Sequence, residues 1–579
     1  MTVRQVNNTI AMASKAHFRV PLSTKISHPT AFSPSLRTGI TSAPWRQNRA
    51  SIPIRPDLWP RNRRMTFTTS TFPIFLAIVF ALYWSVRGHV AQNRVLLVAS
   101  YSFYAWWDWR FCFLMLGSSL VDFELSRRIH LTANHARRKW LLATSLLSNL
   151  GLLAIFKYYN FFIENLLVLT SKIGWAPDIN TISWVLPLGI SFYTFQTLGY
   201  TIDVYRKRIP AAANVTQYLA FVSFFPQLVA GPIERAEKML PQFGVKRQFN
   251  LSHAKEGSKQ ILWGFFKKMV IADRLALAVN PVFDDPSIYS GPHLMMATIF
   301  FAFQIYCDFS AYSDIAIGTA KLFNLRLTQN FAYPYFSQSI SEFWRRWHIS
   351  LSYWFRDYVY IPLGGNQHGS FRRRMNLVVT FLVSGLWHGP AWGFIAWGGV
   401  NGLAVSLPGF GSSRSEHAKV GLQPAPPQAK SAKLESESAT SNEKRAIETP
   451  GSEPFLPRPI TLVRIYATFA TICATWILFR ATSFSDAVLI YQQIATDLFN
   501  GEAYRELLQF LDADRYQRKT ATFLLVFVCW EWVFRRDSFP LQLRRVPLVM
   551  RWMVYTTLIW STLYLMPKTG VGEFVYFEF

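Results

Sequence analysis

Residues 377–407 read LVVTFLVSGLWHGPAWGFIAWGGVNGLAVSL and contain no Asp, Glu, Lys or Arg. A helix that crosses a bilayer needs about 20 mostly apolar residues, because the bilayer core holds no water to satisfy the backbone. Gly389 and Pro390 divide the stretch and are expected to break or kink the helix. The stretch therefore predicts membrane helices rather than the core of a soluble domain.

Similar apolar runs recur along the whole chain. The run at 71–84, TFPIFLAIVFALYW, has no charged residue. By the length criterion the sequence offers about ten to twelve candidate spans, short and re-entrant ones included. Further runs lie at 141–156, 182–199, 219–232, 297–306, 465–478, 522–530 and 554–565. We therefore expect an all-α, polytopic membrane protein.

The charge balance is strongly basic, with 60 Lys and Arg against 33 Asp and Glu and a net charge of +27. In a soluble protein this charge would favour a nucleic-acid partner. In a polytopic protein basic residues gather in cytoplasmic loops instead, and the basic segments 127–139 and 206–208 fit that rule. We expect the membrane as a partner and no nucleic acid.

Residues 326–376 fit neither a clean span nor a soluble loop, because they mix aromatic and charged side chains. Such a segment is tolerated at membrane depth only where protein or a water-filled cavity surrounds it. We expect re-entrant and amphipathic helices here, with breaks at Pro334, Pro362, Gly364 and Gly365.

Two histidines are candidate catalytic residues. His388 lies in the apolar stretch, where an ionisable group is costly and is therefore a functional candidate. A neutral imidazole there can act as a general base, and the alternative is a buried histidine bonded to a neighbouring helix. His348 lies among cations and aromatic residues in SEFWRRWHISLSYWFRDY (341–358), and its alternative is an interfacial histidine on an amphipathic helix.

A metal site is not indicated. The two histidines show neither HxxxH nor HExxH spacing. No CxxC pair occurs, so neither a zinc site nor a disulfide framework is expected. The cysteines are read as structural thiols, at Cys112, Cys307, Cys473 and Cys529.

Two acids interrupt the apolar run QIYCDFSAYSDIAIG (304–318). Asp308 with Tyr312, and Asp314 with Ser310, are i, i+4 neighbours, which gives each acid a hydrogen-bonding partner on its own helix. Structural contacts between helices are favoured over proton relay as their role.

The sequence lacks Walker, GxGxxG and GxSxG motifs, which argues against an ATP-driven pump, a nucleotide-cofactor enzyme and an α/β-hydrolase.

Six motifs follow one another along the chain: LPLGISFYTFQTLGYTIDVYR (186–206), SFFPQLVAGPIERA (223–236), QIYCDFSAYSDIAIG (304–318), FWRRWHISLSYWFRDYVYIPLGGN (343–366), SGLWHG (384–389) and FVYFEF (574–579). Together and in this order they resemble the alginate O-acetyltransferase branch of the membrane-bound O-acyltransferases. The resemblance runs from 65 to 579 and is interrupted after Gly409.

The resemblance implies a funnel-shaped bundle of about eleven transmembrane helices, crossed by a tunnel, in the bacterial inner membrane. His388 would be the catalytic histidine and His348 the second functional one. The enzyme would pass an acetyl group from a cytoplasmic thioester, with acetyl-CoA as donor substrate and no bound cofactor, for O-acetylation of an exported polysaccharide. A periplasmic SGNH-type acetyltransferase would be the partner, and Arg345 and Arg346 would meet the donor phosphates.

The chain is expected to divide into four parts. Residues 1–64 hold eleven Arg or Lys and one acid, which fits a transit peptide or, as favoured by the resemblance, an extension before a true start at Met65. Residues 65–408 would form the membrane core and 459–579 its carboxy-terminal helices. The segment 409–458, rich in Ser, Ala, Glu, Lys and Pro, would be a disordered insertion.

Two other functions stay open from the sequence. One is transfer of D-alanine or another acyl group to a cell-wall polymer or protein by a similar membrane subunit. The other is a polymer or lipid transporter in which the histidines relay protons. Many transporters have duplicated halves, and no internal repeat occurs here.

Overall fold

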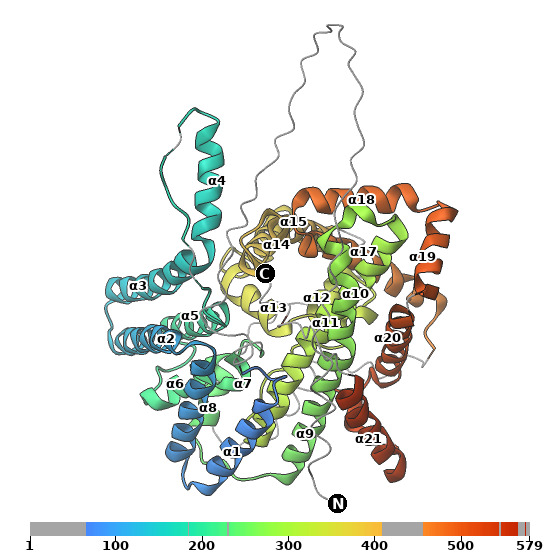
Figure 1. The fold of residues 1–579 in the computed structure, drawn as a ribbon. Coiled ribbons are helices and arrows are strands. Elements are labelled where there is room, and N and C mark those ends of the chain that lie inside the picture. The colour runs from blue at the N-terminus through green and yellow to red at the C-terminus, as the bar shows by residue number, and fades with distance from the viewer. Residues whose placement is uncertain are drawn as a thin grey trace, which may run out of the picture. The chain divides into compact units, whose positions relative to one another are not determined.

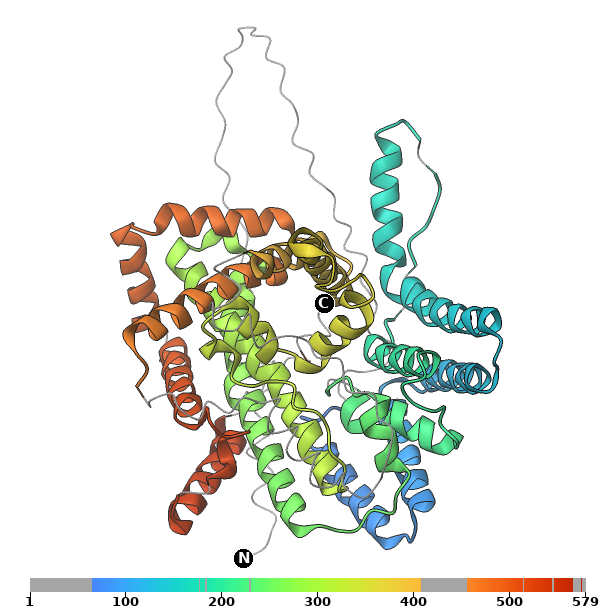
Figure 2. The same ribbon diagram turned by 180° about the vertical axis from the view of Figure 1, so that it is seen from behind.

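The computed structural model describes residues 65–175, 177–182, 185–228, 231–407, 456–513, 515–543, 546–565 and 574. Within these ranges every regular element is a helix and no strand occurs (Figures 1 and 2), which confirms the all-α prediction. The predicted extension 1–64 and nearly all of the predicted insertion lie outside the described residues. Expectations for those two segments therefore stay predictions.

The described helices fall into three groups along the chain. The first group is α1 (Thr71–Ser85), α2 (His89–Leu131), α3 (His135–Leu153), α4 (Tyr159–Ser171), α5 (Ile190–Tyr205), α6 (Val215–Ser223), α7 (Phe225–Leu228) and α8 (Ala236–Phe243). The second is α9 (Leu251–Phe266), α10 (Asp273–Asp284), α11 (Gly291–Leu322), α12 (Ile340–Arg346), α13 (Ile349–Phe355), α14 (Gly369–His388) and α15 (Trp392–Ser406). The last is α17 (Pro459–Arg480), α18 (Phe484–Asp497), α19 (Gly501–Ala513), α20 (Arg515–Phe534) and α21 (Leu548–Leu565). Turns of π-helix lie at η3 (Ala154–Tyr158), η4 (Lys267–Ala272) and η7 (Arg356–Tyr360), and 3-10 turns at η5 (Pro286–Ile288), η6 (Pro334–Phe336) and η8 (Pro540–Gln542).

The long helix α11 is the element around which the site is organised, and it packs against α9, α10, α17, α18 and α19. Figure 1 shows α9 beside α11, and glycines let the two backbones meet. A Cβ on Gly257 would come within 2.5 Å of the Gly318 carbonyl oxygen, and one on Gly264 within 2.8 Å of that of Ala311. Small residues at helix contacts are typical of membrane bundles, where close packing replaces the hydrophobic effect.

Helix length and surface composition agree with a membrane protein. Among the described residues, three helical segments are long and apolar enough to cross a bilayer, at 135–171, 291–322 and 459–480, and α1 is a shorter apolar helix. Large apolar side chains such as Trp140 and Leu147 on α3 are about three-quarters exposed, at 75% and 76%. Contact of such a surface with water is unfavourable, whereas contact with lipid is not. The expected number of about eleven spans stays a prediction.

The segment predicted to hold re-entrant and amphipathic helices consists of short, broken helices, and their re-entrant placement in the membrane stays a prediction. Between α11 and α14 the chain forms η6, α12, α13 and η7, and Pro334 opens η6. Gly364 and Gly365 have φ of 104° and 53°, a left-handed backbone that a Cβ disfavours. These breaks bring His348 back toward the end of α14.

Candidate active site

His388 is the last residue of α14, at a break in a helical hairpin. Gly389 has φ −167° and ψ 155°, which is extended backbone. The following Pro390 restricts the residue before it to such a conformation, so α14 cannot continue. The predicted helix break is confirmed, and α15 begins two residues later at Trp392. The two helices of the hairpin pack closely, since a Cβ on Gly385 would overlap the carbonyl oxygen of Phe394.

The His388 side chain is buried, with 6% of the residue exposed, and aromatic rings enclose it. Ring centroids lie 4.9 Å away for Trp387, 5.1 Å for Trp397 on α15 and 5.3 Å for Phe479 on α17. Edge-to-face contacts of this kind fix the imidazole and surround it with apolar atoms. A group bound at this ring would be kept away from bulk water.

Two side chains of η3 hold the end of α14 (residues 386–388). The last carbonyl groups of a helix have no partner inside the helix and must be satisfied from elsewhere. The Lys157 ammonium donates to the carbonyl oxygens of Trp387 at 2.6 Å and His388 at 3.0 Å. The Tyr158 hydroxyl donates to the Leu386 carbonyl at 3.0 Å. Both side chains belong to a π-helical turn, a feature that is frequent at functional sites.

His348 is buried at 1% exposure and precedes α13 in a left-handed conformation, with φ 44° and ψ 55°. Left-handed backbone is uncommon for a residue other than glycine and is typical of functional sites. Its Nδ1 lies 3.1 Å from the Asn330 Oδ1. The ring meets Phe309 on α11 edge-on at 4.6 Å.

One tryptophan lies against both predicted histidines. The Trp387 ring centroid is 4.9 Å from that of His388 and 6.3 Å from that of His348. The structure therefore brings the two histidines, 40 residues apart in sequence, to one place. The Lys157 ammonium lies 5.8 Å from the centroid of the same Trp387 ring.

Arg345 and Arg346 end α12, three and two residues before His348. Arg345 is exposed, and Arg346 is half-buried. The Arg346 guanidinium forms an ion pair with Glu342 at 2.5 Å, one turn earlier. The two arginines thus lie near the surface while His348 is buried behind them. Their predicted contact with donor phosphates stays a prediction.

The acids of α11 contact two lysines that the sequence reasoning overlooked. The Lys267 ammonium lies 2.7 Å from an Asp314 carboxylate oxygen, and that of Lys268 lies 2.8 Å from Asp308 and 2.9 Å from Asp273. Both lysines belong to η4 and are almost fully buried. The prediction of contacts between helices is confirmed, but the i, i+4 pattern alone missed these partners. Charge inside an apolar run, FFKKMV at 265–270, was the available signal.

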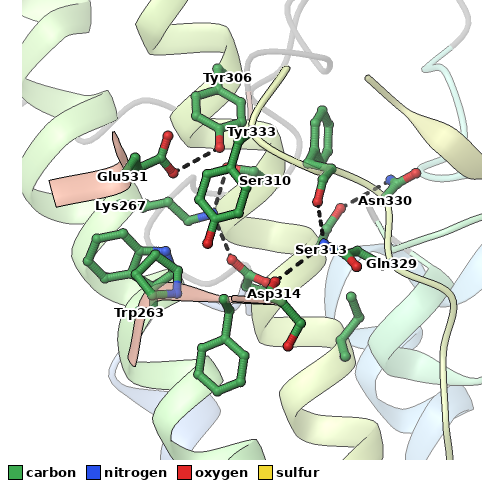
Figure 3. Close-up of a pocket in the computed structure, with 15 residues that line it drawn as sticks. Trp263, Lys267, Tyr306, Ser310, Ser313, Asp314, Gln329, Asn330, Tyr333 and Glu531 are labelled. Carbon is green, nitrogen blue, oxygen red and sulfur yellow. Dashed lines mark hydrogen bonds and ion pairs between the residues drawn. The ribbon is translucent and has the colours of Figure 1, made fainter. Parts of the chain in front are cut away.

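A small polar cavity of about 30 Å³, enough for a water-sized group, adjoins this charged cluster (Figure 3). Lys267 also donates to the Ser310 hydroxyl at 2.6 Å, and the Tyr306 hydroxyl donates to the Glu531 carboxylate at 2.8 Å. Asn330 borders the cavity and also contacts His348, so it links the cavity to the histidine site. In the described part of the chain no three His, Cys, Asp or Glu side chains gather closely enough to hold a metal ion.

The sequence of this chain is similar to a known protein family and to several known proteins. Residues 206–418 match the model of the membrane-bound O-acyltransferase family. The chain is 41% identical over 346 residues to a probable alginate O-acetylase of Pseudomonas putida, covering 59% of this chain and 70% of that protein. It is 36% identical over 375 residues to a peptidoglycan O-acetyltransferase of Helicobacter pylori, covering 59% and 70%. A teichoic acid D-alanyltransferase of Streptococcus thermophilus is 29% identical over 269 residues, covering 43% and 65%.

Proposed function

This chain belongs to the membrane-bound O-acyltransferase family, in its alginate O-acetylase-like branch, and is an acyltransferase; from that premise we propose that it passes an acetyl group from a cytoplasmic thioester across the membrane for O-acetylation of an exported polysaccharide. The observation that carries the proposal is His388 at a helix break inside an aromatic enclosure. Relatives named for acetylation of alginate and of peptidoglycan support a carbohydrate polymer as the final acceptor.

In the proposed reaction His388 is the general base. It takes the proton from an acceptor hydroxyl, and the hydroxyl oxygen attacks the thioester carbonyl carbon. A carbon–oxygen bond forms, the carbon–sulfur bond breaks, and the proton passes from His388 to the departing thiolate to give the free thiol. The apolar rings around His388 exclude water, which would otherwise hydrolyse the thioester.

The donor is proposed to be acetyl-CoA as a substrate, entering from the cytoplasmic face. The exposed Arg345 on α12 is suited to contact its phosphates, because a guanidinium binds phosphate through two parallel hydrogen bonds. The location is proposed to be the bacterial inner membrane, with a periplasmic SGNH-type acetyltransferase as the partner that completes transfer to the polymer.

Transfer of D-alanine is the second candidate, supported by the D-alanyltransferase relative. Acetyl and D-alanyl esters differ in mass and charge, so ester analysis of surface polymers separates the two functions.

The test compares ester content of exported polymers in cells that carry the wild-type chain, His388→Ala or His293→Ala. His293 is a matched control, because it is 8% exposed and lies at the start of α11, outside the site. We expect acetyl ester in the wild type and in His293→Ala, and its loss in His388→Ala at equal membrane abundance. Equal ester in all three strains would contradict the proposal.

A further inference from the structure

The Asn330 side chain is buried at 1% exposure and lies between His348 and α11. Its Oδ1 accepts from the Ser350 backbone N–H at 3.3 Å and from the Ser350 hydroxyl at 2.9 Å, and it lies 3.1 Å from the His348 Nδ1. Its Nδ2 donates to the Ser313 hydroxyl on α11 at 3.2 Å (Figure 3). Every polar atom of this amide is therefore in use.

These contacts fix which end of the amide faces His348. A backbone N–H can only donate, so the atom facing Ser350 must be the amide oxygen. The Ser350 hydroxyl already accepts from the Ile233 N–H at 3.0 Å, which leaves its own hydrogen for Asn330. The orientation of the Asn330 amide is thus set by the Ser350 backbone N–H, which is always a hydrogen-bond donor.

The same contacts determine the state of the His348 ring. An amide oxygen accepts, so the His348 Nδ1 must carry hydrogen and donate to it. In a neutral imidazole the other nitrogen is then a bare acceptor. The His348 Nε2 is buried and has no hydrogen-bond partner among the described residues. A buried polar atom without a partner is costly, and such an atom in a native site is available to a ligand.

We propose that Asn330 is a positioning residue that holds His348 with its proton on Nδ1, so that Nε2 accepts a hydrogen bond from a substrate O–H or N–H group other than the hydroxyl that His388 deprotonates. The backbone beside the ring is held as well, because the Ile349 N–H donates to the Asn330 carbonyl at 2.9 Å. A neutral ring in this form cannot donate from Nε2 to an oxyanion. His348 therefore orients the bound substrate through that group rather than stabilising the tetrahedral intermediate.

The substrate part of this inference rests on the proposed acyl transfer, but the state of the ring can be measured without substrate. Solid-state ¹⁵N NMR of the full chain in lipid bilayers, with labelled histidine, distinguishes protonated from bare ring nitrogens. His348→Gln identifies the signals of His348 by difference. We expect Nδ1 protonated and Nε2 bare in the wild type and in Ser313→Ala, which keeps the Oδ1 contact, and loss of that form in Asn330→Leu. A His348 protonated on Nε2 in the wild type, or an unchanged ring in Asn330→Leu, would overturn the inference.

Kinetics with radiolabelled acetyl-CoA in isolated membranes test the consequence for the reaction. Asn330→Leu should lower kcat by about 100-fold, the usual effect of misplacing a bound substrate by about 1 Å. Asn330→Asp keeps an acceptor for Nδ1–H and should retain more activity. Its carboxylate favours the imidazolium form, so the acid limb of its kcat/KM profile should move to higher pH. A purely structural role would lower both variants equally at every pH, and that result would refute the assignment. Absence of transfer in the wild type, with the NMR result intact, would refute the proposed function and not the ring assignment.

Discussion

Replacing Lys157 by methionine should lower acyl transfer, because the Lys157 ammonium binds the backbone carbonyl of His388. Methionine keeps a long apolar side chain in η3 and removes the ammonium that binds the carbonyl oxygens of Trp387 and His388. The end of α14 would then have two carbonyl groups without their donor. The position of the His388 ring depends on this helix end, so we expect the variant to misplace the base.

The size of the effect follows from the two hydrogen bonds. A hydrogen bond from a charged donor contributes about 1.5–3 kcal/mol, so the two together contribute about 3–6 kcal/mol. Removing the ammonium also removes the desolvation cost of a partly buried charge, so the net loss of free energy should lie near the lower end of the range of about 3–6 kcal/mol. A loss of about 3 kcal/mol in the placement of His388 corresponds to a rate about 100-fold lower, at about 1.4 kcal/mol per factor of ten.

The assay is transfer from radiolabelled acetyl-CoA in membranes that contain equal amounts of each variant. Tyr158→Phe is the matched control, because it removes one neutral donor to the Leu386 carbonyl from the same turn. That bond contributes about 1 kcal/mol, so a loss of about fivefold is expected. Lys157→Arg keeps a charged donor and should fall between the wild type and Lys157→Met. Activity of Lys157→Met within twofold of the wild type would refute the reasoning.

Three further perturbations follow from the packing and the charges. Asp308→Asn removes one carboxylate from the buried Lys268 and should destabilise the fold by about 3–5 kcal/mol, seen as a lower unfolding temperature in detergent; an unchanged temperature would contradict the pairing. Gly385→Ala places a Cβ against the Phe394 carbonyl and should push α14 away from α15, which lowers activity. Gly399→Ala should lower activity far less, because its Cβ meets only the end of the Leu382 side chain at 3.4 Å. Equal losses of activity in the two variants would contradict close packing of α14 on α15. Arg345→Ala should raise KM for acetyl-CoA with little change in kcat, whereas Arg346→Ala should act less because Arg346 is half-buried and Arg345 is exposed; an effect confined to Arg346→Ala would reverse the two roles.

Much of the fold was predictable because lipid imposes a simple rule on sequence. Long runs without charge, such as 377–407, identify helices in a bilayer, and Gly389 and Pro390 marked the break that the structure contains. Sequence context made His388 and His348 candidates, and motif resemblance then gave each a role in acyl transfer. The structure adds that both lie against Trp387, which sequence distance alone could not reveal.

The residues that support the histidines were harder to find. Lys157 and Asn330 act through bonds to partners 230 and 18 positions away in sequence, and such pairings depend on how helices pack. Short sequence patterns do not show which helices pack against one another. The lysines at 267 and 268 were different, because charge in an apolar run was visible and would have suggested an ion pair with the acids of α11.

The most direct test of the central claim is a single-turnover measurement of acetyl transfer in inverted membrane vesicles supplied with radiolabelled acetyl-CoA. Wild-type and His293→Ala vesicles should release free CoA and incorporate label into acid-insoluble material at similar rates. His388→Ala vesicles with the same protein content should do neither above the background of vesicles without the protein. Transfer at the wild-type rate by His388→Ala would contradict the assignment of His388 as the base.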